Sequence, residues 1–288
     1  MSRDAPQGPT GATRRAAVIG LGAAGLAGAG PAPAPARRIV SLNPCLDAIL
    51  VTVAEAAQIA ALSHYSRQPG ASSIGDLARR FAYTYETAEE VIALSPDLVL
   101  ASRHSSVATL NALARLHIRV AEFSSPDSVV ESLGQIRRIA DLAGHPELGR
   151  AEIARIEAAL AAAAPPPGSR PVRALVYQRN GFASGPNTLM DELLRRTGFH
   201  NVAADYGYKR SADVPLDQVL SDPPQVLLSG ETLPGAPTWG ERVMHHPALE
   251  RLRGRIQIVN FPAHLMYCGG PNLIPAAERL AEARRAAA

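Results

Sequence analysis

The chain has 288 residues, of which 47% are hydrophobic, and a formal net charge of +3. This length and composition allow one large core or two medium-sized cores. The basic residues are all arginine apart from Lys209, which together with the abundant alanine indicates a compositional bias of the genome. The small net charge excludes the basic surface typical of nucleic-acid-binding proteins. Two cysteines, Cys45 and Cys268, are too few for a disulfide framework or a cysteine-rich metal site.

Residues 1–36 have the pattern of an export signal. Two arginines precede an uncharged run over residues 16–30, and alternating proline and alanine follow. The run is too short for a membrane-spanning helix, which needs about 20 apolar residues. The arginine pair is typical of a twin-arginine signal, and a Sec signal fits it as well. We expect cleavage near Ala34 or Ala36, no lipid anchor because no cysteine stands there, and a soluble periplasmic protein.

Residues 20–25 match G-x-G-x-x-G, the phosphate-binding pattern of dinucleotide enzymes. That pattern opens a helix, and Pro31, Pro33 and Pro35 are incompatible with one here. The strand that should carry a ribose-binding acid is also missing. We therefore interpret the glycines as part of the export signal and predict no cofactor.

One pattern of residue classes occurs twice, at residues 88–102 and 216–230. Each copy begins with an acid, Glu89 or Asp217, continues as a short amphipathic helix, stops at a proline and runs into an aliphatic strand. A continuous run of leucine and valine is typical of a parallel strand buried on both faces. The copies are too far apart for a solenoid and indicate two α/β lobes that face each other across a cleft. The same order also occurs as a common α/β element without duplication.

In chain order, the sequence predicts strands that alternate with helices. Asn43 and Thr87 are the expected N-caps, and Thr87 with Glu90 matches a capping box. The first lobe, residues 37–125, is expected to contain strands at 38–42, 59–62, 98–101 and 120–123, helices at 45–53 and 107–116, and the first repeat. Residues 126–168 are expected to form connecting helices, one from about 125 to 143 and one at 147–164. The second lobe, residues 169–288, is expected to contain strands at 172–177 and 256–260, helices at 189–197, 246–251 and from 272, and the second repeat.

Taken together, these motifs resemble the cobalamin and ferric-siderophore class of periplasmic solute-binding proteins. The resemblance covers nearly all of residues 38–285. It is carried by the first strand and helix, the first repeat at 89–100, the phrase Ala-Ser-Gly-Pro at 183–186 ahead of the helix pattern at 189–203, and the second repeat at 217–220.

The resemblance implies an α/β fold with two Rossmann-like lobes joined by one long backbone helix, here residues 147–164. It also implies a ligand held between the lobes and delivered to an ABC permease and its ATPase. The expected ligand is a small-molecule metal chelate, such as a ferric siderophore or cobalamin. We expect a monomer that is not an enzyme and binds no nucleic acid.

Family members carry one acid on the outer face of each lobe for docking to the permease, and the matching positions are Glu89 and Asp217. Asp217 departs from the commoner glutamate and has a reach shorter by one methylene. An acid in the first turn of a helix is also favoured by the helix dipole, by about 0.3–1 kcal/mol, so both acids have a structural explanation as well.

Candidate ligand contacts follow from the position of the crevice, which in open α/β sheets lies beyond the carboxyl ends of the strands. Rings supply apolar area and guanidinium groups pair with carboxylates, which suits a large planar or acidic chelate. For any single candidate, ordinary packing of an aromatic ring or a solvated surface position of an arginine is an equally valid interpretation. The candidates of the first lobe are Asn43, Cys45, His64, Tyr65, Arg67, Tyr83 and either Arg103 or His104. Those of the second lobe are Arg179, Tyr208, Arg210, Trp239, His264, Tyr267 and Cys268.

Two other functions remain open at this point. A carrier of bare Zn²⁺ or Mn²⁺ would use His64, His104 and His264, although metal-carrying relatives usually place an acid in the last loop, where this chain has none. An exported chelate-modifying enzyme is the other, but no G-x-S-x-G motif occurs and we predict no catalytic residues.

The family fold would place Cys45 and Cys268 near each other, from opposite lobes. Either a bridge or two free thiols fits that placement. We expect free thiols, because buried free cysteine is common.

Overall fold

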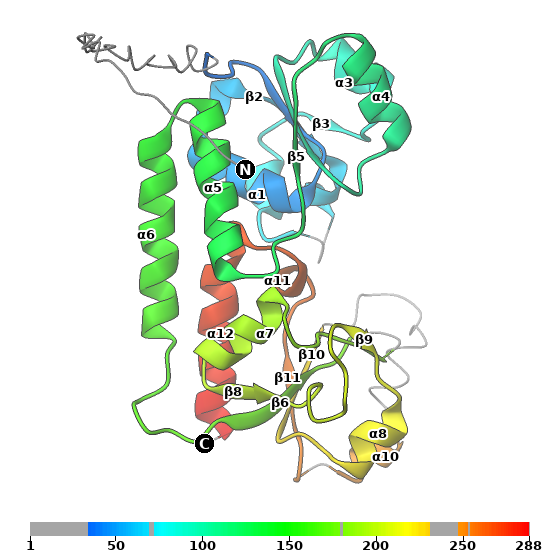
Figure 1. Ribbon diagram of the computed structural model, residues 1–288, viewed down its shortest axis with the longest axis vertical. Helices are drawn as coiled ribbons and strands as arrows, with labels where there is room; N and C mark the ends of the chain where they lie inside the picture. The colour runs from blue at the N-terminus through cyan, green and yellow to red at the C-terminus, as the bar shows by residue number, and fades with distance from the viewer. Residues whose placement is uncertain (1–33, 69–71, 179–180, 231–246, 253, 288) are drawn as a thin grey trace, which may run out of the picture. The chain divides into compact units, whose positions relative to one another are not determined.

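The computed structural model describes residues 34–68, 72–178, 181–230, 247–252 and 254–287, and its first sheet has five parallel strands (Figure 1). The strand order is β3-β2-β1-β4-β5. Strand β1 is central, with β2 and β3 added on one side of it and β4 and β5 on the other. Strands β1 and β4 are buried along their whole length, as their uncharged sequences require. The strands are β1 (Ile39–Ser41), β2 (Ile59–Ser63), β3 (Tyr83–Thr84), β4 (Leu98–Ser102) and β5 (Val120–Phe123).

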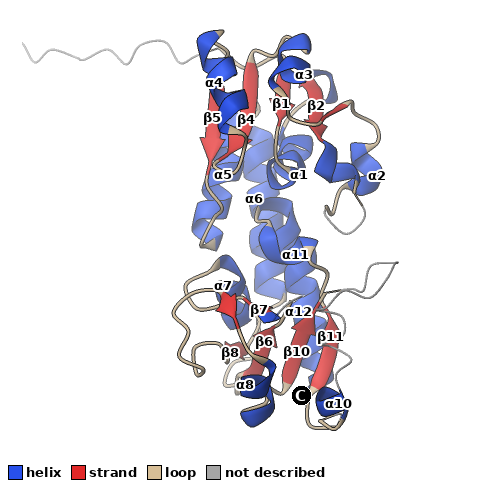
Figure 2. Cartoon of the chain, turned by 90° about the vertical axis from the view of Figure 1, so that its right-hand side faces the viewer, coloured by secondary structure: helices blue, strands red, loops and turns tan. Residues whose placement is uncertain are grey.

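Helices cover both faces of this sheet (Figure 2). Successive strand residues point to opposite faces, so Leu98 packs into the cluster with α1 and α5, whereas Val99 packs into the cluster with α3 and α4. The helices of this lobe are α1 (Pro44–Val53), α2 (Gly75–Ala78), α3 (Ala88–Ala93) and α4 (Val107–Arg115), with the 3-10 turns η1 (Ala56–Gln58) and η2 (His64–Arg67).

Two consecutive helices, α5 (Val129–Ala143) and α6 (Pro146–Ala162), follow the first sheet. The prediction that α5 starts near residue 125 was wrong, because Ser128 caps the helix by accepting the N–H of Glu131. Helix α6 matches the expected backbone helix and packs against α5, α1 and the last helix of the chain.

The second lobe has a four-stranded parallel sheet in the order β11-β10-β6-β8 and a small antiparallel pair, β7 with β9. Its strands are β6 (Val172–Val176), β7 (Phe182–Ala183), β8 (Phe199–Asn201), β9 (Ala212–Asp213), β10 (Val226–Ser229) and β11 (Gln257–Asn260). Its helices are α7 (Leu189–Arg196), α8 (Leu216–Ser221), α10 (Pro247–Glu250), α11 (His264–Tyr267) and α12 (Leu273–Ala287), with the 3-10 turn η4 (Gly270–Asn272). The predicted α/β class with two lobes is confirmed.

Both copies of the repeated pattern form the same unit, a short helix followed by a buried strand. They are α3 with β4 and α8 with β10, and each helix buries one valine completely, Val91 or Val219. The capping box was only half right. Thr87 accepts the N–H of Glu90, but the Glu90 carboxylate accepts from Thr84 and from the N–H of Tyr85.

The expectation of free thiols was wrong, because Cys45 and Cys268 form a disulfide across 223 residues of sequence. Cys45 lies in the first turn of α1, where Asn43 caps the helix as predicted by accepting the N–H groups of Cys45 and Leu46. Cys268 directly follows α11. The bridge therefore joins the start of the first lobe to the segment that leads into the last helix.

We expect unreduced, denatured protein to contain no reactive thiol and reduced protein to contain two. A Cys45→Ser, Cys268→Ser double variant should lose about 2–5 kcal/mol of unfolding free energy, because a bridge that closes so long a loop restricts the unfolded chain. Thiol titration and urea unfolding test this. Two reactive thiols before reduction would contradict the bridge.

Candidate functional site

The candidate site of the first lobe is built at the carboxyl ends of β2 and β3. Strand β2 ends at Ser63, whose hydroxyl accepts the N–H of Tyr65 and so starts the 3-10 turn η2. Strand β3 pairs with β2 in parallel register, with Leu62 opposite Tyr83. This pairing brings two loops that are about 20 residues apart in sequence to one edge of the sheet.

Five side chains gather there, and we call them the aromatic cluster: His64, Tyr65, Arg67, Tyr83 and Tyr85. The His64 ring lies 3.9 Å from that of Tyr65 and 4.9 Å from that of Tyr85, and Tyr83 meets Tyr85 edge to face at 5.5 Å. The Arg67 guanidinium carbon stands 4.3 Å from the Tyr83 ring centre. The three tyrosines are 42–59% exposed, so their rings offer apolar surface that the fold itself does not cover.

Arg67 is held from two sides. Its guanidinium donates a hydrogen bond to the carbonyl of Phe81 and lies over the Tyr83 ring. These contacts fix the positive charge of the half-buried arginine beside the exposed rings.

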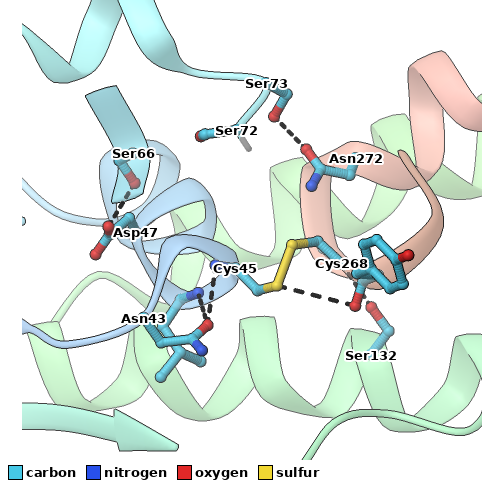
Figure 3. Close-up of a disulfide and its surroundings, with 12 residues drawn as sticks. Asn43, Cys45, Asp47, Ser66, Ser72, Ser73, Ser132, Cys268 and Asn272 are labelled. Carbon is cyan, nitrogen blue, oxygen red and sulfur yellow. Dashed lines mark hydrogen bonds between the residues drawn. A yellow bond between two sulfur atoms is a disulfide. The ribbon is translucent and has the colours of Figure 1, made fainter. Parts of the chain in front are cut away.

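The buried carboxyl group of Asp47 on α1 binds the turn η2 through hydrogen bonds. Asp47 is fully buried, and its Oδ2 accepts the N–H of Ser63 at 3.0 Å. The same oxygen accepts the hydroxyl of Ser66 (Figure 3). Burial raises the pKa of Asp47 well above its ordinary value, against the opposing effect of hydrogen bonds from Ser41, Ser66 and Ser63. The turn that carries Tyr65 is thus tied to helix α1 through one carboxyl group.

Glu86 lies at the other side of the cluster and has a left-handed backbone, with φ at 70°. Its N–H donates to the Thr84 hydroxyl, its carbonyl accepts from Thr109, and its Oε1 accepts from Ser63 at 3.0 Å. The same oxygen is 4.0 Å from Nδ1 of His64. Burial raises the pKa of Glu86, and the Ser63 hydrogen bond and His64 oppose this. These contacts hold a backbone conformation that is costly for a residue other than glycine.

The other first-lobe candidates are more dispersed. The side chain of Asn43 is committed to capping α1, and Cys45 is committed to the disulfide. Arg103 and His104 follow β4 and are exposed. The structure therefore brings together His64, Tyr65, Arg67 and Tyr83 of the predicted first-lobe set, and adds Tyr85.

In the second lobe, Tyr208 packs against the hydrophobic cluster of that lobe and donates its hydroxyl to Gln218. The exposed Arg210 pairs with Asp127 at 3.0 Å. His264 and Tyr267 both lie on α11, and Tyr267 is 55% exposed. The remaining candidates of this lobe, Arg179 and Trp239, lie outside the described residues.

Sequence reasoning left Tyr85, Asp47 and Glu86 out of the site. A signal existed for the tyrosine, because Tyr83 and Tyr85 are two residues apart next to a strand and so share a face. Asp47 stands between apolar residues in a helix with a buried face, which is a signal for a buried acid. Nothing in the sequence around Glu86 marks its left-handed backbone.

The two acids of the repeat, Glu89 and Asp217, are exposed in the first turns of α3 and α8, as predicted. Within the described ranges, no group of three His, Cys, Asp or Glu side chains is arranged to hold a metal ion. No described helix has both the length and the apolar character of a membrane span.

The comparison with known families decides the identification. Residues 39–253 match the family model described as periplasmic binding protein. The chain belongs to this family. Among curated relatives, the cobalamin-binding proteins of two Halobacterium salinarum strains are 27% identical over 198 residues, which are 67% of this chain and 54% of theirs. The chain thus spans about half the length of the curated relatives it matches.

Several solved periplasmic binding proteins share the fold. The heme-binding protein RhuT of Roseiflexus sp. RS-1 has a TM-score of 0.68 at 22% identity, covering 86% of this chain and 98% of its own. The vitamin B12-binding protein BtuF of Vibrio cholerae has a TM-score of 0.66 at 19% identity, covering 88% and 99%. An Fe3+-hydroxamate transport protein of Saccharomonospora viridis has a TM-score of 0.66 at 21% identity, covering 87% and 93%.

The buried acid gives the first test at this site. Because the pKa of Asp47 is raised in the folded state, the folded protein holds more protons than the unfolded chain. Its contribution to stability is therefore present below the unfolded pKa of about 3.9 and is lost as pH rises towards the folded pKa. Asp47→Asn mimics the protonated acid, so the unfolding free energy of this variant should fall less as pH rises. At pH 7 the variant should be at least as stable as the unsubstituted protein.

Urea unfolding between about pH 4 and pH 8 measures the effect, with the exposed Asp213→Asn as the matched control. Asp47→Ala should be destabilised by about 1–3 kcal/mol, because it leaves the N–H of Ser63 buried without an acceptor. An Asp47→Asn variant that is less stable than the unsubstituted protein at pH 7 would show that the acid is ionised in the fold.

Proposed function

We propose that the protein is the substrate-binding component of an ABC importer, which captures a metal chelate between its lobes and delivers it to a membrane permease. The chelate is a ferric siderophore, cobalamin or a related compound. The observation that carries this proposal is the aromatic cluster at the carboxyl ends of β2 and β3, with its exposed tyrosine rings and anchored arginine.

The cluster suits such a ligand in two ways. Exposed rings of Tyr65, Tyr83 and Tyr85 supply flat apolar area for a large ligand, and Arg67 supplies a fixed positive charge for carboxylate groups. The histidine and tyrosines also carry atoms that bind iron or cobalt. The names of the similar proteins point the same way, because cobalamin, heme and Fe3+-hydroxamate are all metal chelates.

Binding in the absence of catalysis fits these comparisons, since the similar proteins are named as binding or transport proteins. We propose export to the periplasm through the signal in residues 1–36, of which residues 1–33 lie outside the described part. We also propose that Glu89 and Asp217 dock to the permease, because equivalent positions of a repeated unit present an exposed acid in each lobe.

The aromatic cluster gives a direct test of ligand binding. Tyr65→Ala should raise the Kd for hemin or cyanocobalamin about tenfold or more, because it removes a ring worth about 1.5–3 kcal/mol when buried. Tyr65→Phe should retain affinity if the ring only stacks and lose it if the phenol oxygen binds the metal. Absorbance titration measures both variants.

Arg67→Ala should weaken binding of these carboxylate- or amide-bearing chelates, with Arg150→Ala as the control because Arg150 is exposed on α6. Equal affinity of the unsubstituted protein, Tyr65→Ala and Arg67→Ala would show that the ligand does not contact the aromatic cluster.

Docking has a separate test. The double variant Glu89→Ala, Asp217→Ala should keep its ligand affinity and lower both uptake and ATPase stimulation in vesicles that contain the transporter, because ion pairs at an interface speed association and fix register. Replacement by arginine should have a larger effect, because the family resemblance implies arginines on the permease and like charges would then meet. Glu157→Ala, Glu278→Ala, which removes two other exposed acids, is the control. Normal transport by the first variant at limiting protein concentration would refute the docking role.

A further inference from the structure

The segment of residues 268–272, which we call the junction segment, belongs to the second lobe in sequence but is attached to elements of the first half of the chain (Figure 3). Cys268 is bridged to Cys45 on α1. The N–H of Gly270 donates to the hydroxyl of Ser132 on α5 at 2.7 Å. The hydroxyl of Ser73 donates to Oδ1 of Asn272. Three different parts of the chain thus hold one five-residue segment.

Two glycines allow the junction segment to approach so closely. A Cβ at Gly269 would lie 2.3 Å from the hydroxyl oxygen of Ser132, and a Cβ at Gly270 would lie 2.6 Å from Cγ1 of Ile49. Gly270 also has a φ of 65°, which other residues rarely adopt. The close approach of the junction segment to α1 and α5 therefore depends on glycine at positions 269 and 270.

Most of the attachment is buried, although Ser73 is exposed and Cys45 is half-buried. Ser132 is 0% exposed, Asn272 is 2% exposed and Cys268 is 5% exposed. Hydrogen bonds in such surroundings are costly to break, because a buried polar group without a partner loses its solvation and gains nothing in return.

Helix α1 links this attachment to the aromatic cluster. Cys45 and Asp47 lie two residues apart at the start of α1. Cys45 is bridged to the junction segment. Asp47 accepts hydrogen bonds from Ser63 and Ser66 of the turn that carries Tyr65. On the other side, the junction segment directly follows α11, which carries His264 and Tyr267.

We propose that the junction segment is a positioning element, which fixes α11 relative to the aromatic cluster through the common anchor of α1, so that a chelate meets a preformed site. The inference rests on the proposed binding function and adds residues outside the ligand contacts. Preformed geometry lowers the ordering cost of binding, so cutting the attachment should weaken affinity and speed dissociation.

The bridge can be cut without changing the sequence. One thiolate of dithiothreitol attacks a sulfur of the bridge and releases the other cysteine, and the second thiol of the reagent then closes its ring and releases the first. Two electrons pass to the protein, which gains two thiols, and the reagent becomes the cyclic disulfide. Each thiolate of the reduced protein then displaces one bromide of dibromomethane, with two protons and two bromide ions released in all. The product links the two sulfurs through one methylene group, which restores a covalent link that is not a disulfide.

The experiment compares the oxidised protein, the reduced protein, the methylene-linked protein, C45S/C268S and Ser132→Ala. Hydrogen exchange of amides 264–272 is the first readout, and the Kd and dissociation rate of hemin and cyanocobalamin are the second. We expect exchange at least tenfold faster and affinity about tenfold weaker in the reduced protein and C45S/C268S, with recovery of both in the methylene-linked protein. Ser132→Ala, which keeps the bridge, should show a smaller change in the same direction.

Leu113→Ala is the matched control, because Leu113 is fully buried on α4 and its truncation destabilises the fold away from the junction segment. It should leave exchange at 264–272 and ligand affinity unchanged. Equal exchange in oxidised and reduced protein, or weakened binding without recovery on methylene linkage, would overturn the positioning role. If the oxidised protein binds neither probe, the proposed function fails for these chelates, and the exchange data still decide whether the junction segment is fixed by the bridge.

Discussion

The close contact of residues 268–272 with helices α1 and α5 is the constraint on which the arrangement of the chain depends. The last helix, α12, starts directly after this segment and packs against α6, so a fixed start also fixes how the end of the chain lies on the connecting helix. The contact needs two glycines without side chains and one disulfide, and a Cβ at either glycine would meet another residue at less than 3 Å. The bridge thus joins the segment that follows β1 to the segment that follows β11.

Buried polar groups, and not apolar packing alone, set the geometry of the candidate site. Tyr65 and Tyr85 lie in the segments after β2 and β3, and such connecting segments are ordinarily the more mobile parts of an α/β lobe. Here Asp47 and Glu86 hold those segments through Ser63, which donates its N–H to one and its hydroxyl to the other. Burial raises the pKa of the fully buried Asp47 and of the half-buried Glu86, so the surroundings of both carboxyl groups disfavour their charged forms.

The sequence was sufficient for the α/β class and the repeated unit, because buried strands and proline stops are local signals. Both α3 with β4 and α8 with β10 were predictable for this reason. The Cys45–Cys268 bridge was not, since the pairing of two residues 223 apart depends on how the whole chain packs. The start of α5 was misplaced because several residues before it are plausible caps and only the fold selects Ser128.

The sequence predicted where the candidate site lies but not which residues form it. Strand ends identified His64, Tyr65, Arg67 and Tyr83, which do gather, whereas Tyr208 faces the core of its own lobe and Arg210 is paired with Asp127. Residue type and position along a strand do not reveal which side a loop residue faces, and that choice depends on neighbours distant in sequence.

Native mass spectrometry of the protein purified from its native host shows whether the protein carries a metal chelate. We expect an added mass equal to that of an iron or cobalt chelate, metal and organic part together, and its loss on denaturation. Protein that carries only a bare zinc or manganese ion would contradict binding of a chelate.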